Sequence, residues 1–151
     1  MAKQVHSAVR SVRRQMGDPT LGEPRRRDFG NLLQLPDNNP DILQSQVARF
    51  RELLRSDPND QPSWVGLGRT LMEMGRPAEA VDPLRRAVEL EPEDTTAHRD
   101  LGRSLLESDS PTEAAEIFAR AIGLAEAAGD IRTGHEIHAF LRQADKRLDQ
   151  R

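Results

Sequence analysis

The sequence predicts an all-α protein built from stacked helix pairs, and the main reason is an internal repeat. Eight residues recur at a spacing of 34, and a unit of this length holds two short helices and a turn. Such a unit buries its apolar face only against a neighbouring unit, so the repeat indicates a scaffold rather than an active site. The first copy holds Trp64, Leu67, Gly68, Leu71, Ala80, Leu84, Ala87 and Leu90, and the second holds His98, Leu101, Gly102, Leu105, Ala114, Phe118, Ala121 and Leu124.

Composition narrows the class of protein further. The chain has 151 residues, the length of one domain, and it has no cysteine, so disulfides and thiolate metal sites are excluded. No apolar run of membrane-spanning length and no secretory signal is visible in the sequence. We therefore expect a soluble, cytoplasmic protein without a transmembrane segment.

Charge divides the chain into a basic arm and an acidic body. Residues 1–27 carry seven basic and two acidic side chains, a net charge of +5, and the remainder carries fifteen basic and twenty-three acidic ones, a net charge of −8. Glycine, proline and asparagine punctuate 17–40 without a lasting period, which predicts a flexible linker. We expect a flexible basic N-terminal arm and linker at 1–40, followed by a helical domain at 41–149.

The arm admits several interpretations. Val5, Val9, Val12 and Met16 have the spacing of a short amphipathic helix. The positive charge suits a solvated tail, a segment that steers towards nucleic acid or an anionic membrane, or a targeting peptide. Binding of nucleic acid is disfavoured because no aromatic residues alternate with the arginines. The apolar run at 29–35 either covers the open face of the first domain helix or docks into the groove of this or another copy.

The helical domain is expected to hold about six antiparallel helices. A helix at 42–56 matches the second half of a repeat whose first half is missing, because Phe50 aligns with Leu84 and Pro58 with Pro92. Two full repeats follow at 61–94 and 95–128. A helix at 130–149 is expected to cap the stack, since its C-terminal end is rich in basic residues.

Local signals predict where the helices begin and end. Gly75 has the position of a C-cap after the first helix of the first repeat. Ser110, followed by Pro111 and then by Glu113, has the form of a capping box and predicts a helix start at Pro111. Pro83 lies inside a predicted helix, where the missing N–H donor is expected to cause a kink or a late helix start.

The recurring residues resemble the tetratricopeptide repeat, whose signature is W-x2-L-G-x2-Y, then A-x3-F, then P. The first copy keeps Trp64, has Leu71 and Leu84 in place of the tyrosine and the phenylalanine, and ends at Pro92, whereas the second has Glu126 in place of the final proline. The second helix of that copy is therefore expected to extend to about Ala128. The resemblance covers 42–128 and implies a right-handed superhelix, in which the first helix of each pair lines a concave groove that usually binds peptides.

Close packing is the physical reason for this signature. Gly68 and Gly102 have no side chain where the first helix of each pair meets its partner, and the second helices carry small residues at matching positions, namely Ala80, Ala87, Ala114 and Ala121. Small residues allow the helices to approach each other, and large residues fill the gaps that remain.

Candidate groove residues lie on the stripe opposite the signature. Three arginines on this stripe, Arg69, Arg99 and Arg103, either hold a partner carboxylate by bidentate hydrogen bonds or are solvated charges paired with nearby acids. The family's known carboxylate-gripping groove uses asparagines and lysines that are absent here, so that specificity is not transferred. The contact candidates are Val65, Arg69, Met72, Glu73, Arg99, Arg103, Leu106 and Glu107, and the acids that could neutralise the arginines are Glu73, Asp100 and Glu107.

No phosphate-binding loop, nucleophile elbow or zinc signature is present in the sequence. His135 and His138 are the clustered metal-type ligands, but no third ligand accompanies them, and His98 stands at the tryptophan position of the repeat, where a packing role is expected. We therefore expect no enzyme, metal or cofactor. The predicted function is an adaptor that binds a peptide or helix of a protein partner, acidic if the arginines bind it. The alternatives are a self-associating structural module and an adaptor whose basic arm binds nucleic acid or a membrane surface.

Overall fold

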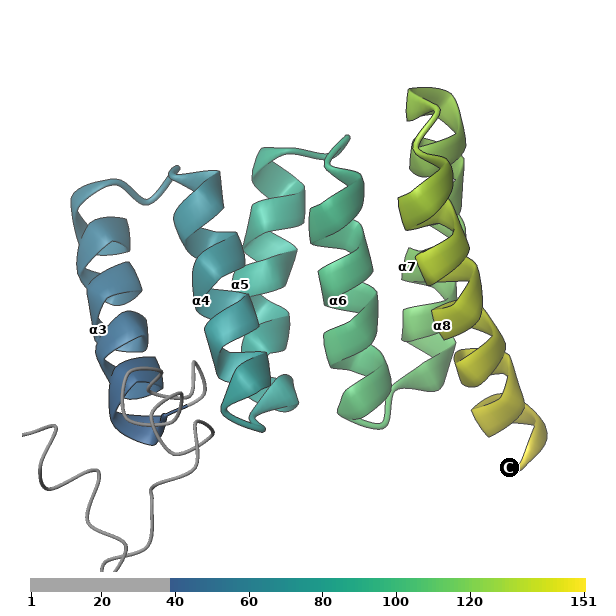
Figure 1. Ribbon diagram of the computed structural model, residues 1–151, viewed down its shortest axis with the longest axis horizontal. Coiled ribbons are helices and arrows are strands. Elements are labelled where there is room, and N and C mark those ends of the chain that lie inside the picture. The colour runs from purple at the N-terminus through teal and green to yellow at the C-terminus, as the bar shows by residue number, and fades with distance from the viewer. Residues whose placement is uncertain (1–38) are drawn as a thin grey trace, which may run out of the picture. The chain divides into compact units, whose positions relative to one another are not determined.

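The computed structural model describes residues 39–151, and the predictions for the arm lie outside the described residues. This part of the chain contains six helices and no strand (Figure 1). The predicted all-α fold class is confirmed. In chain order the helices are α3 (Pro40–Ser56), α4 (Gln61–Glu73), α5 (Pro77–Leu90), α6 (Thr95–Glu107), α7 (Pro111–Ala128) and α8 (Ile131–Asp149).

The helices form a stack of antiparallel pairs. Each helix contacts the next one along the chain, α4 also contacts α6, and α6 also contacts α8. Figure 1 shows α4, α6 and α8 side by side, with α5 and α7 behind them. We call the surface formed by α4, α6 and α8 the first-helix face, because α4 and α6 are the first helices of the two predicted repeats.

The core consists mainly of the residues that recur in the repeat. Burial of a leucine or phenylalanine side chain stabilises a fold by roughly 1.5–3 kcal/mol, so these positions hold the stack together. Trp64 is half-buried, and its indole N–H donates a hydrogen bond of 2.8 Å to the carbonyl oxygen of Pro58. The buried signature residues are Leu67, Gly68, Leu71, Ala80, Leu84, Ala87, His98, Leu101, Gly102, Leu105, Ala114, Phe118 and Ala121.

Each full repeat is held together by a large side chain that lies on a glycine. A Cβ atom on Gly68 would come within 3.0 Å of the Leu84 side chain, and one on Gly102 would come within 3.0 Å of the Phe118 ring. Such distances are too short for carbon atoms, so only glycine fits at these positions. The ring of Phe50 in α3 lies on Gly66 of α4 in the same manner.

Three of the described helices end in a left-handed residue. Gly75 follows α4 with φ of 72°, Asp109 follows α6 with φ of 63°, and Gly129 follows α7 with φ of 69°. In each case the next residue donates its N–H to a carbonyl five residues back, at 2.9, 2.8 and 2.9 Å respectively. This is the Schellman arrangement, which satisfies carbonyl groups that a helix end leaves unpaired. Gly75 thus closes α4 at the position that the sequence indicated.

Two local predictions are confirmed or corrected only in part. α7 begins at Pro111 as predicted, but the side chain of Ser110 makes no capping hydrogen bond. The return bond from Glu113 is also absent, because the backbone N–H of Ser110 donates to Leu105 and Glu113 pairs with Arg85 of α5. Of the two outcomes predicted for Pro83, the late helix start is wrong, since α5 begins at Pro77 and runs through Pro83. Pro83 is buried, so packing of the helix outweighs its missing hydrogen bond.

An aspartate caps the start of α8. The Asp130 carboxylate accepts a hydrogen bond of 3.1 Å from the backbone N–H of Thr133. Hydrogen bonds from the side chain and the backbone of Thr133, followed by the charges of Arg132 and Arg99, hold the pKa of Asp130 below its ordinary value of 3.8. The cap is therefore stronger when the carboxylate is ionised.

Acidification is expected to weaken this cap. Because the pKa of Asp130 is lower in the folded chain, its contribution is present above about pH 4 and is lost as the pH falls through the folded-state pKa. The Asp130→Asn variant keeps an acceptor atom but no charge. Thermal unfolding of both proteins is followed by circular dichroism from neutral to acidic pH. The wild type should unfold at a higher temperature than the variant at neutral pH, and this difference should disappear on acidification. A difference in unfolding temperature that does not change with pH would show that the carboxylate charge is irrelevant.

Substitution of the repeat glycines tests the packing of the pairs. Gly102→Ala should lower the free energy of unfolding by about 1–3 kcal/mol, because the new methyl group overlaps the Phe118 ring. Gly123→Ala is the matched control, since nothing lies near its Cβ position within α7, and it should raise stability by about 0.5–1 kcal/mol. Urea denaturation measures both values. Equal effects of the two substitutions would contradict the packing argument.

Candidate partner-binding face

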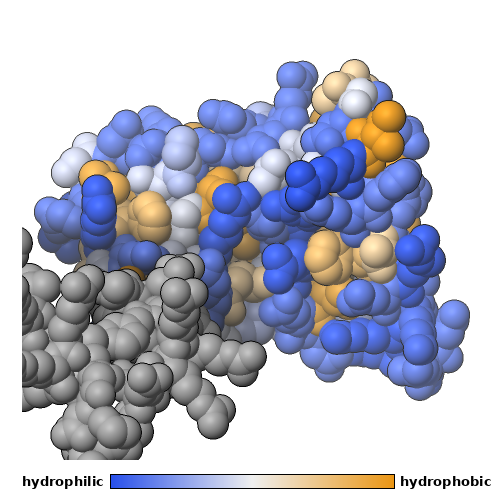
Figure 2. Space-filling view, viewed as in Figure 1, coloured by the Kyte–Doolittle hydropathy of each residue, from blue (hydrophilic) through white to orange (hydrophobic). Residues whose placement is uncertain are grey.

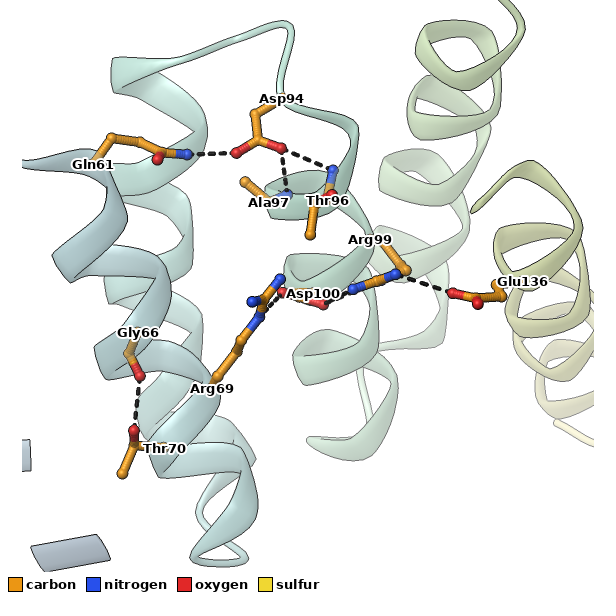
Figure 3. A network of polar contacts seen from close by, with 10 residues as sticks. All are labelled: Gln61, Gly66, Arg69, Thr70, Asp94, Thr96, Ala97, Arg99, Asp100 and Glu136. Atoms are coloured by element: carbon orange, nitrogen blue, oxygen red, sulfur yellow. Dashed lines mark hydrogen bonds and ion pairs between the residues drawn. The ribbon is translucent and has the colours of Figure 1, made fainter. Parts of the chain in front are cut away.

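A row of charged side chains crosses the first-helix face from α4 through α6 to α8. The Nε atom of Arg69 donates to Asp100 at 2.5 Å, and Arg99 donates to the other oxygen of Asp100 from Nε and Nη2, at 3.2 Å each. The Nη1 atom of Arg99 also donates to Glu136 of α8 at 3.0 Å. Figure 3 shows these four side chains in line. We call Arg69, Asp100, Arg99 and Glu136 the ion-pair row.

Asp100 is the centre of this row. Its side chain is only 5% exposed, whereas the side chains of Arg69 and Arg99 are 46% and 21% exposed. A carboxylate that is removed from water in this way needs charged partners, and two arginines supply them. The carboxylate that Arg69 and Arg99 hold is therefore one of the chain's own, which agrees with the interpretation that these arginines pair with nearby acids.

Arg103 lies apart from the row, so the three arginines do not converge on one point. Its guanidinium carbon lies 5.4 Å from the ring centroid of Phe140 in α8, a distance that permits a cation–π contact. One of its nitrogens, Nη2, lies 3.5 Å from a Glu107 oxygen. Phe140 in turn stacks on Phe118, with ring centroids 5.7 Å apart. Arg103 therefore helps to join α6 to α8.

The arginines differ in how many donors they have left. Arg99 uses all three of its nitrogens on Asp100 and Glu136. Arg69 uses only Nε, and its two terminal nitrogens make no hydrogen bond within the described residues. Its fixed and half-exposed side chain therefore presents two donors to solvent. Arg69 is the member of the row best able to bind an acceptor from outside.

Two of the predicted contact residues are buried instead. Val65 is 8% exposed and packs with Ala87 and Ala97, and Leu106 is 2% exposed and belongs to the main core. These two residues lie on the stripe opposite the signature, but a first helix contacts neighbours on several sides, so its buried surface extends beyond the signature stripe. Met72 is half-buried against the main core, whereas Glu73 and Glu107 are exposed.

A second polar contact between α4 and α6 was missed by the sequence argument. The side-chain amide of Gln61 donates to Asp94 at 2.6 Å, and the other Asp94 oxygen accepts the N–H groups of Thr96 and Ala97 at the start of α6 (Figure 3). An aspartate before two threonines is a capping signal in the sequence. The link to Gln61, 33 residues away, has no such local signal.

The three histidines within the described residues lie in two different environments. His98 is fully buried, and its Nδ1 lies 2.9 Å from the carbonyl oxygen of Asp94. Because that oxygen can only accept, Nδ1 carries the proton, and Nε2 has no partner among the described residues. His135 and His138 are exposed on α8. Residues 39–151 contain no group of three or more side chains able to hold a metal ion, and no helix among them is long and apolar enough to cross a bilayer.

The stacked pairs and their glycine contacts define a helical-repeat protein. The family model described as tetratricopeptide repeat matches this sequence at 47–89 and at 65–131, together more than half of the chain. The chain therefore belongs to the tetratricopeptide repeat family. A comparison with curated proteins gives no significant match.

Solved structures with a similar fold share little sequence with this chain. A T3SS complex from Aeromonas hydrophila matches with a TM-score of 0.70 and 16% identity, covering 96% of this chain and 99% of that one. PcrH in complex with the chaperone binding region of PopD matches with a TM-score of 0.67 and 17% identity, covering 74% of this chain and 85% of that one. The TPR2B domain of yeast Sti1 in complex with pHsp70 matches with a TM-score of 0.63 and 16% identity, covering 72% of this chain and 83% of that one. At these identities the likeness shows the fold.

Removal of the central carboxylate tests the role of the row. Asp100→Asn should lower the free energy of unfolding by about 1–3 kcal/mol, because it leaves two arginines without their buried partner. Glu107→Gln serves as the control, since its ion pair with Arg103 is half-exposed on one helix and should contribute about 0.5 kcal/mol or less. Urea denaturation distinguishes the two. Equal losses would show that Asp100 is only a surface charge.

Proposed function

We propose that this chain is a non-enzymatic adaptor that binds a peptide or helix of a partner protein on its first-helix face. Its membership of the tetratricopeptide repeat family supports a role in protein interaction. Two proteins of similar fold are seen with bound partners, PcrH with a region of PopD and the Sti1 domain with pHsp70. These likenesses support the kind of function but not the choice of partner.

The observation that carries the proposal is the fixed orientation of Arg69. Its Nε is bound to Asp100, so the terminal nitrogens are held in place before a ligand arrives. Preorganisation of this kind reduces the entropy that binding costs. The two terminal nitrogens can donate to a carboxylate in a bidentate manner or to backbone carbonyl groups. An acidic side chain or a chain terminus of the partner is the ligand that matches them best.

The rest of the face limits how tightly a partner can bind. Figure 2 shows a mainly hydrophilic surface across its middle, and the charged side chains there are balanced, because Arg69, Arg99 and Arg103 face Asp100, Glu136 and Glu107. A partner therefore meets ordered polar groups rather than a strong positive field. We expect modest affinity that depends on a few hydrogen bonds, since ion pairs at exposed positions contribute little.

A single substitution tests the proposed face. Arg69→Gln removes the two unused donors but leaves Asp100 paired with Arg99, so the fold should persist. The control is Arg86→Gln on α5, whose side chain is similarly exposed, at 42%, and also forms one ion pair. We expect a partner captured from lysate of the source cells to bind Arg69→Gln about tenfold more weakly or worse, a loss of about 1.5–3 kcal/mol. Calorimetry with that purified partner measures the change.

Equal affinities of the Arg69→Gln protein and the wild type would contradict the proposed face. A loss that also occurs with Arg86→Gln would show that the effect is not specific to the first-helix face. Circular dichroism of each variant confirms that the helices are intact before binding is compared.

A further inference from the structure

The described stack has an unmatched helix at each end. α3 aligns with the second helix of a repeat and, among the described helices, contacts only α4. The first helix α6 contacts the second helix before it, α5, and the first helix of the preceding pair, α4. α8 contacts α7 and α6 in the same way, so α8 has the position of a first helix. In residues 39–151, then, one end lacks a first helix and the other end lacks a second helix.

A groove between α3 and α4 marks the first of these positions. Its volume is about 430 Å³, and its apolar lining comes from Phe50, Leu53 and Gly66. Leu53 is 43% exposed. The charged residues that line it are both basic, Arg49 and Arg69. We call this hollow the α3–α4 groove.

A groove between α7 and α8 lies at the other end of the described stack. Its volume is about 360 Å³, and Ile122 and Ile131 are part of its apolar lining. Ile131 is 73% exposed. The carboxylates that line it belong to Glu126 and Asp130, and no arginine or lysine is present. We call this hollow the α7–α8 groove.

The two grooves are complementary in both apolar surface and charge. Within the described residues, Leu53 and Ile131 are the large hydrophobic side chains that remain exposed, and each groove contains one of them. Hydrophobic surface is visible at both ends of the stack in Figure 2. One groove carries two arginines and the other two carboxylates, so contact between them pairs opposite charges.

We propose that copies of this chain associate head to tail through these grooves. α8 of one copy occupies the first-helix position beside α3 and α4 of the next copy, and that copy's α3 occupies the second-helix position beside α8, against the part of α8 that lines the α7–α8 groove. The contact thus completes one repeat from two chains. Because it joins two different surfaces, it leaves a free groove at each end and continues beyond a dimer, into open chains or rings.

This association shares one residue with the proposed partner-binding face. Arg69 contributes to both the ion-pair row and the α3–α4 groove, so it is left unchanged in the test. The variants are Leu53→Asp, which blocks the α3–α4 groove, and Ile131→Asp, which blocks the α7–α8 groove. Both side chains are exposed, so the folded chain tolerates the change. Ala78→Asp, which adds the same charge to an exposed position of α5 and lines neither groove, is the control.

Sedimentation velocity of the full-length proteins at increasing concentration measures the association. The wild type and Ala78→Asp should rise in mass beyond a dimer, and each groove variant alone should remain monomeric. An equimolar mixture of the two variants should form a one-to-one dimer and nothing larger, because each variant retains one intact groove. Association should also weaken with added salt, since opposite charges contribute to it.

Several outcomes would overturn the proposal. A wild type that stays monomeric at the highest concentration excludes the association. A groove variant that dimerises on its own indicates a symmetric contact between like ends or a contact elsewhere. A mixture that remains monomeric, although each variant is folded by circular dichroism, shows that the two grooves do not meet.

Discussion

The close approach of paired helices over a glycine is the constraint on which the rest of this structure depends. Leu84 lies on Gly68 and Phe118 lies on Gly102, so each first helix comes nearer to its partner than any side chain would allow. The alanines that recur in the second helices, Ala80, Ala87, Ala114 and Ala121, are fully buried. Because the same contact recurs in both repeats, the pairs adopt the same geometry and their first helices come to lie side by side (Figure 1).

The polar chemistry of the first-helix face follows from that spacing. Only because α4 and α6 are neighbours can Arg69 reach Asp100, and only because α8 takes the next place can Arg99 reach Glu136. Asp100 takes up much of the positive charge that a carboxylate ligand would otherwise meet. What remains for a partner is a small number of oriented donors, chiefly those of Arg69. The proposed adaptor function thus depends on geometry more than on net charge.

The sequence predicts the parts of this protein that repeat and misjudges those that join one repeat to another. The signature residues identify the helices, the glycine contacts and the family, because their periodicity is local. The burial of Val65 and Leu106, the pairing of Asp100 with Arg69 and the partner of Gln61 all depend on contacts between helices, which a helix wheel does not contain. The capping box at the start of α7 was misjudged for the same reason, since Glu113 pairs with Arg85 of α5, although the predicted helix start at Pro111 is correct. The candidate site was therefore only partly predictable.

The most direct test of the central constraint is a measurement of nuclear Overhauser effects across the two helix pairs. We predict strong effects between the Hα protons of Gly102 and the ring protons of Phe118, and between those of Gly68 and the methyl groups of Leu84, because these atoms are in contact. Their absence in a protein whose helices are otherwise formed would contradict the account, since the pairs would then be separated and the ion-pair row could not form as described.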